Sequence, residues 1–73
     1  MIQQLTIATI QEHLTHAREK HPWPDDMTDC EKYRIVEREL NEMGVAMLKG
    51  DKRGAKAEAL DCIAVLIRIV EGD

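Results

Sequence analysis

The spacing of apolar and polar residues predicts three helices and no strand. The first is expected from about Ile2 to Lys20, because its apolar positions recur at roughly helical spacing. Residues 21–26 then include two prolines, and each disfavours helix in the residue before it. The apolar positions of this first segment are Leu5, Ile7, Ala8, Ile10, Leu14 and Ala17.

The second and third predicted helices are joined by a short turn. Thr28 followed by Glu31 is a capping-box pattern, so the second helix is expected to begin near Thr28. Gly50 suits the left-handed position after a helix end, and Asp51 can cap a third helix that runs to about Glu71. The apolar stripe of the second helix is Tyr33, Val36, Leu40, Met43 and Met47.

The later half of the third helix, residues 62–67, is apolar nearly all round. A helix that is hydrophobic on every side is normally buried on every side. Three helices of one short chain cannot easily surround it. We therefore expect an all-α fold with a central antiparallel helical hairpin, completed to a four-helix or larger bundle by homo-oligomerisation.

Size and composition limit the remaining possibilities. The 73 residues, 1–73, are expected to form one domain, and a core of this size rarely contributes more than ~3–5 kcal/mol. No signal peptide or membrane helix is expected, so we predict a cytoplasmic protein with Cys30 and Cys62 reduced. The net charge of −4 argues against nucleic acid and anionic membranes as partners.

Two pairs of acidic residues flank the predicted turn. Glu39 and Glu42 are three apart, as are Glu58 and Asp61, and residues at that spacing share a helix face. If the chain folds back at Gly50, residues whose numbers add up to about 100 lie at the same height. Glu42 then lies level with Glu58, and Glu39 with Asp61.

Four carboxylates gathered in this way raise one another's pKa and cannot all stay ionised unaided. A hard divalent cation resolves the conflict, because such ions prefer oxygen ligands. The sequence therefore predicts a site for Mg²⁺, with Mn²⁺ as a possible substitute. The other interpretation of the four acids is a solvated face without an ion.

The acidic pattern and its surroundings resemble those of the MazG-like nucleotide pyrophosphohydrolases. The pattern is Glu-x-x-Glu, a spacer of 15 residues, and Glu-x-x-Asp. Residues 21–26, 35–42 and 57–65 resemble the loop, second helix and third helix of short, phage-type members. The resemblance covers roughly residues 12 to 71.

The resemblance implies an activity and a set of site residues. The family hydrolyses nucleoside triphosphates to the monophosphate and pyrophosphate with Mg²⁺, and its members are dimers or tetramers. Carried over by position, Glu39, Glu42, Glu58 and Asp61 are expected to be the metal ligands. Glu39 is our choice for the general base that activates water, because it lies nearest the apolar stripe.

Two departures from the family pattern keep other functions open. Arg38 and Asn41 stand where many members have Glu and Gly, and the sequence ends at Asp73 without the basic segment that longer members use to contact phosphates. One alternative is a nucleotide-binding module of the same fold that has lost catalysis. Another is a helical interaction module, for which the apolar third helix is the argument.

Three further residues are candidates for substrate binding. Trp23 is expected either to stack on a nucleobase or to plug the end of the bundle. Arg68 either contacts a phosphate or, as we favour, reaches solvent or pairs with Glu71. Lys56, near Lys52 and Arg53, either steers an anionic substrate or is simply solubilising.

Two other residue types are assigned no chemistry. His13 and His16 lie three apart on the first helix, and without an acid or thiol clearly joining them we expect surface histidines. Cys62 is expected to be a small core residue.

Overall fold

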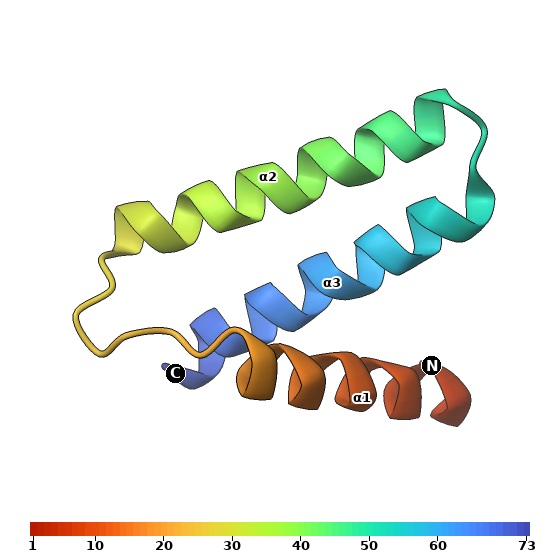
Figure 1. Ribbon diagram of the computed structural model, residues 1–73. Helices are drawn as coiled ribbons and strands as arrows, with labels where there is room; N and C mark the ends of the chain where they lie inside the picture. Colours follow the sequence, from red (N-terminus) through yellow and green to blue (C-terminus); the bar gives the residue numbers. More distant parts are fainter.

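The computed structural model of residues 1–73 is entirely helical. It contains α1 (Gln4–Lys20), α2 (Asp29–Leu48) and α3 (Lys52–Glu71), and no strand (Figure 1). The three predicted helices are therefore confirmed, with ends that differ by at most two residues from the expected ones. None of the three is long and apolar enough to span a membrane.

Local signals set the ends of the two hairpin helices as expected. The Glu31 backbone N–H donates to the Thr28 hydroxyl at 3.1 Å, and the Thr28 backbone N–H donates to the Glu31 carboxylate at 3.4 Å, which completes the capping box. Gly50 has a φ of 73°, in the left-handed region that favours glycine. Asp51 accepts a hydrogen bond of 2.8 Å from the backbone N–H of Gly54 and so caps α3.

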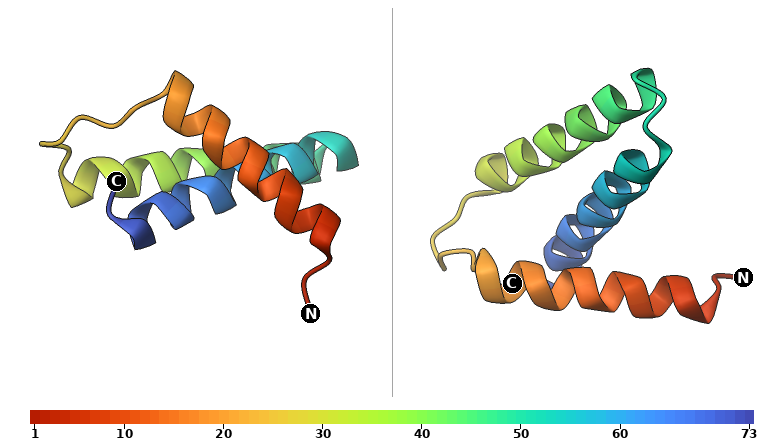
Figure 2. Two further views of the ribbon diagram at one scale, coloured as in Figure 1. Left: turned by 90° about the horizontal axis from the view of Figure 1, so that it is seen from below. Right: turned by 45° about the vertical axis from the view of Figure 1, so that its right-hand side comes forward.

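The three helices are arranged with α3 in the middle. It packs against α2 on one side, as the antiparallel hairpin predicts, and against α1 on the other, whereas α1 and α2 do not pack together (Figures 1 and 2). Figure 2 also shows that α1 crosses the hairpin obliquely. A cleft lies between α1 and α2, and Glu39 and Asp61 are among the residues that line it.

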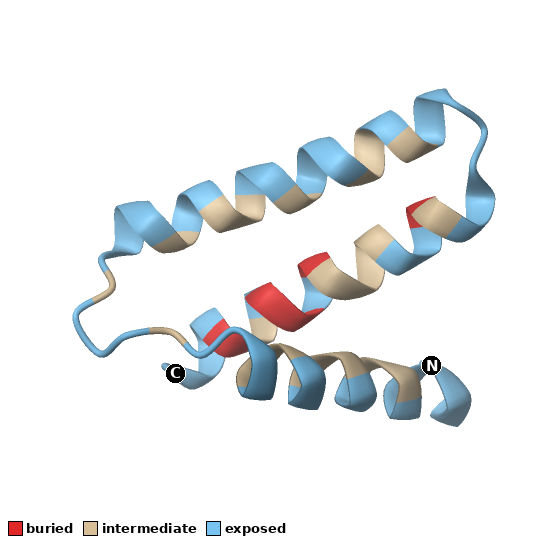
Figure 3. Ribbon diagram, viewed as in Figure 1, coloured by how far each residue is buried: buried red, intermediate tan, exposed pale blue.

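The core of the single chain is small and belongs to α3 alone. All fully buried residues lie on this helix (Figure 3). They are Ala55, Cys62, Ala64, Val65 and Arg68. The expected core position of Cys62 is confirmed, and burial raises the pKa of its thiol.

The predicted buried stripes are wrong in part for the isolated chain. On α2, Val36 and Met43 are half-buried, but so is Glu39, which lies in the same row, while Leu40 is 46% exposed. Two adjacent rows of α2 are compatible with the same seven-residue spacing, and only one of them can face α3. Tyr33 and Met47 belong to the exposed row.

The other two helices also leave apolar residues exposed in the single chain. Leu5 and Ile7 are exposed because α1 crosses α3 obliquely, and the half-buried residues of α1 begin only at Thr9. The sequence predicts that a second chain covers the later half of α3, and part of this half is exposed in the single chain. Its exposed apolar residues are Ile63, Leu66, Ile69 and Val70.

Candidate metal centre

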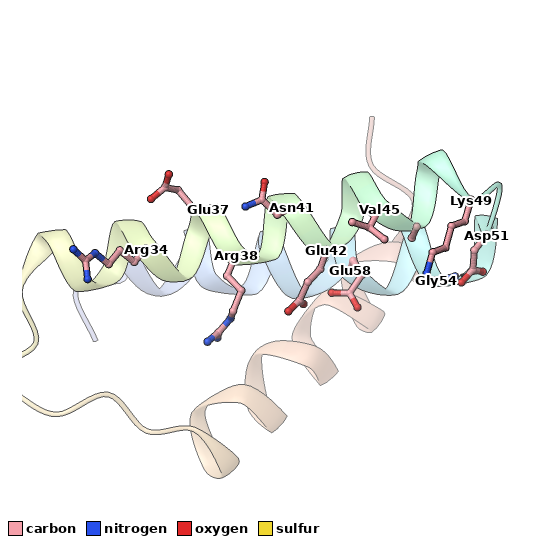
Figure 4. A pocket seen from close by; sticks show the side chains of 11 residues that line it. Arg34, Glu37, Arg38, Asn41, Glu42, Val45, Lys49, Asp51, Gly54 and Glu58 are labelled. Carbon is pink, nitrogen blue, oxygen red and sulfur yellow. Dashed lines mark hydrogen bonds between the residues drawn. The ribbon is translucent and has the colours of Figure 1, made fainter.

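The turn brings carboxylates from both hairpin helices together. Oxygen atoms of Glu39 on α2 and of Glu58 and Asp61 on α3 all lie within 4.8 Å of one another. Glu42, the fourth predicted member, lies beside Glu58 at the edge of this group (Figure 4). The predicted hairpin register thus brings three of the four acids within reach of one ion and leaves the fourth adjacent.

Burial within this group is uneven. The Glu39 side chain is only 14% exposed, whereas that of Asp61 is 48% exposed. Burial raises the pKa of Glu39 above its usual range, and the charges of Glu42 and Asp61 raise it further. Burial also raises the pKa of Glu58, and its contact and charge repulsion with Glu42 add to this.

Two carboxylate oxygens in the group have no partner. Oε2 of Glu39 and Oε2 of Glu58 are buried and accept no hydrogen bond. A buried polar atom without a partner is destabilising, and an ionised one more so, so such groups normally hold a proton or a cation. An all-oxygen donor set fits Mg²⁺ or Mn²⁺ rather than a soft transition metal.

His13 is attached to this group, which the sequence did not predict. Its Nδ1 lies 3.0 Å from Oδ1 of Asp61, and its side chain is 31% exposed rather than free on the surface. His16 is exposed and forms no hydrogen bond or ion pair. The expectation of two surface histidines is therefore wrong for His13, because the crossing of α1 over α3 places Asp61 beside it.

Arg38 is the positive charge next to the acids. Its Nη2 lies 3.8 Å from Oε1 of Glu39, and its side chain is 65% exposed. Figure 4 shows the guanidinium on the side of α2 that also carries the Glu42 carboxylate, while Glu37 and Asn41 point to the other side. Its charge acts against the factors that raise the pKa of Glu39, without outweighing them.

Two clefts border the acidic group. One, of about 900 Å³, lies between α1, the loop at Trp23 and the hairpin, and includes Glu39, Asp61 and Arg38 in its lining. The other, of about 670 Å³, lies on the far side of Arg38 and includes Glu42 and Glu58 (Figure 4). Arg38 and the acids therefore separate two open volumes that a ligand can enter.

Arg68 lies neither in solvent nor against Glu71. It is 3% exposed, and its Nε donates to Asp73 Oδ2 at 3.0 Å. The guanidinium carbon lies 4.1 Å from the centre of the Trp23 ring, a cation–π contact. The expected solvent exposure and ion pair with Glu71 are wrong, because Glu71 accepts instead from Arg18 Nη2 at 2.6 Å.

The other two candidate substrate residues lie in different places. Trp23 is half-buried and lines the larger cleft together with Arg68. Lys56 is exposed and forms no ion pair, and it lines a separate hollow with Lys52 and Arg53. The structure therefore brings Trp23 and Arg68 near Glu39 and Asp61, but not Lys56.

Comparison of the chain with models of known families, with curated proteins and with solved structures gave no match.

Proposed function

We propose that this protein is a MazG-like nucleotide pyrophosphohydrolase that depends on Mg²⁺, with Mn²⁺ as a substitute. The observation that carries the proposal is the group of three carboxylates from two hairpin helices, with two buried oxygens that lack a partner. Its residues occur in the order and spacing of the paired-acid motif. Both free cysteines fit the reducing cytoplasm, where we place the protein.

In this proposal Glu39, Glu58 and Asp61 hold the ion, with Glu42 completing the set. The bound ion neutralises charge on the phosphates and lowers the pKa of water. A water oxygen forms a bond to the α-phosphorus, and the bond from that phosphorus to the pyrophosphate oxygen breaks. Glu39 takes the proton of the water as general base.

The substrate lies in the larger cleft in this proposal. Trp23 supplies an aromatic face for the base, and Arg68 is the buried cation behind it. Arg38 contacts the phosphates, because its side chain is exposed beside the acids and only loosely paired with Glu39. Lys56 lies outside this cleft and attracts the anionic substrate toward the protein by its charge.

We place a second copy of the chain on the exposed apolar side of the hairpin, which makes the protein a homodimer or a homotetramer. The chain exposes 5751 Å², whereas a folded monomer of its mass exposes about 4,600 Å². The excess of about 1,100 Å² is comparable to the area that each partner buries in a stable dimer, about 800 Å² or more.

The residues of this side come from both hairpin helices. On each helix they lie to one side of the residues that form the α2–α3 contact, as the helical spacing indicates. We call this set the apolar face; it consists of Tyr33, Leu40, Met47, Ile63, Leu66 and Val70. Pairing two such faces produces the four-helix bundle.

The deciding experiment is pyrophosphate release from a panel of ribo- and deoxynucleoside triphosphates with Mg²⁺, with Mn²⁺ and with EDTA. Metal-dependent release that the substitution Glu58→Gln abolishes, with helix content unchanged, supports the proposal. Full activity of the Glu58→Gln variant contradicts the site assignment.

A second candidate function is nucleotide binding without catalysis. The observation that favours it is Arg38, which lies 3.8 Å from the proposed base Glu39 and acts to lower the pKa of that carboxyl. It predicts metal-dependent nucleotide binding in calorimetry with no pyrophosphate released from any nucleotide. Turnover at ordinary enzyme rates excludes it.

A further inference from the structure

Among the side chains of α1, His13 is the one that forms a hydrogen bond with the proposed metal-binding carboxylates. The contact joins His13 Nδ1 to Asp61 Oδ1 at 3.0 Å across 48 residues of sequence. Both side chains are partly shielded from water, with 31% of His13 and 48% of Asp61 exposed. A carboxylate accepts hydrogen bonds, so Nδ1 is the nitrogen that carries the proton and donates.

Asp61 needs such support more than the other carboxylates of the group. Glu39 is enclosed by the α2–α3 contact and is only 14% exposed. Asp61 lies at the open edge, and rotation about the last bond of a free aspartate side chain is broad. The hydrogen bond from His13 fixes one of its oxygens and thereby sets the direction in which the other lone pairs point.

We infer that His13 is a positioning residue for the metal centre, which holds Asp61 in the orientation that binds the ion. The inference rests on the proposed function, because Asp61 is a ligand only if the centre binds a cation. Partners of metal-binding carboxylates in other proteins commonly change metal affinity about 10–100-fold when they are replaced. The alternative is that His13 only helps α1 to dock on α3.

Three variants separate positioning from docking. His13→Asn places an amide N–H near the position of Nδ1, so it restores the donor to Asp61. His13→Gln has similar polarity but places its amide nearer the position of Nε2, so it loses that contact. His16→Ala is the matched control, because His16 lies three residues further along α1, lines the same cleft and forms no hydrogen bond.

The test is the dissociation constant for Mn²⁺, measured by calorimetry on the full chain without nucleotide, with circular dichroism to verify the helices. We expect His13→Gln to weaken binding about 10–100-fold. We expect His13→Asn to stay within about threefold of the unchanged protein and His16→Ala to match it. Equal affinity in His13→Gln and the unchanged protein overturns the inference while the metal centre stands.

Two further outcomes are informative. If the unchanged protein binds no Mn²⁺, both the proposed function and this inference fall. If His13→Gln does not fold, long-range ¹H–¹⁵N spectra of the unchanged protein decide instead, because positioning requires a proton on Nδ1 of His13. A proton on Nε2 of His13 overturns the inference.

Discussion

Glu39 on α2 and Glu58 on α3 approach each other across the hairpin, and each keeps one carboxylate oxygen buried without a hydrogen-bond partner. The fold thus holds two negative charges in a position that is unfavourable for both. Burial raises the pKa of both carboxyls. The charges of Glu42 and Asp61 raise the pKa of Glu39 further, and contact with Glu42 raises that of Glu58. This arrangement lowers the stability of the domain when no ligand is bound. Such a loss of stability is typical of binding sites.

The substitution Glu58→Gln should raise the melting temperature of the metal-free protein, because it removes one charge from a crowded group. The same substitution should abolish the increase in melting temperature that Mg²⁺ produces in the unchanged protein. Both effects are measured by thermal unfolding followed by circular dichroism. Glu37→Gln, at an exposed position on α2, should change neither value. A lower melting temperature for Glu58→Gln in EDTA contradicts the prediction.

The stability of the metal-free protein should fall as the pH rises above the unfolded-state pKa of glutamate, about 4.3. The folded pKa values of Glu39 and Glu58 are raised, so the folded chain binds more protons than the unfolded chain in this range. The slope of the unfolding free energy against pH is then negative. Urea unfolding in EDTA between pH 5 and 7 measures this slope. It corresponds to a difference in bound protons between the folded and unfolded chain on the order of one or two at most. Saturating Mg²⁺ should reduce it, and a positive slope in EDTA contradicts the assignment.

The substitution Asp73→Asn should destabilise the fold by about 1–3 kcal/mol, because it removes a hydrogen-bonded charge from the buried Arg68. Asp73 also binds Arg18 on α1 at 2.6 and 3.0 Å, so the end of α1 should loosen as well. Urea unfolding at pH 7 measures the loss. The control Glu71→Gln removes only an exposed contact and should cost at most about 1 kcal/mol.

The same carboxylate has its own dependence on pH. Hydrogen bonds from Arg18 and Arg68 hold the pKa of Asp73 below its usual range. The stability that it contributes is complete above the unfolded value of about 3.9 and is lost as the pH falls through the lower folded value. The difference in stability between the unchanged protein and Asp73→Asn should therefore shrink below about pH 4. A difference that stays constant down to pH 2 contradicts the ion pair.

The double substitution Leu40→Ser and Leu66→Ser should convert the oligomer to a monomer with its helices retained. Both side chains are 46% exposed in the single chain and belong to the apolar face. Size-exclusion chromatography with light scattering measures the mass. Leu5→Ser is the control, since Leu5 is 78% exposed on α1 and lies outside that face. If the unchanged protein is a stable monomer that also binds no metal, a helical interaction module with a different partner becomes the better interpretation.

The substitution Arg38→Gln should weaken metal-dependent nucleotide binding about tenfold or more, because it removes one charge-assisted hydrogen bond to phosphate. Calorimetry with a non-hydrolysable nucleotide measures the change. Arg34→Gln, one turn earlier on α2 and lining only the smaller cleft, should have little effect. Equal effects of the two substitutions would indicate a general attraction by charge rather than a contact by Arg38.

The sequence by itself determined the features that depend on neighbours within one turn of helix. Thr28, Gly50 and Asp51 mark the helix ends because caps and left-handed turns involve residues only a few positions apart. The closeness of Glu39, Glu58 and Asp61 could also be predicted, because a tight turn between two straight helices fixes which residues lie at the same height.

Two features were decided only by the tertiary structure. They are the contacts that α1 makes and which of two equivalent rows of α2 faces α3. The oblique crossing of α1 over α3 brings His13 to Asp61 and Arg18 to Asp73, and neither pair has a signal in the spacing of residues. On α2, the row with Glu39 packs against α3, while the row with Leu40 stays exposed, although the apolar pattern favoured the opposite. The physical reason is that side-chain packing, which sums many weak contacts between distant segments, sets both the crossing and the rotation of each helix.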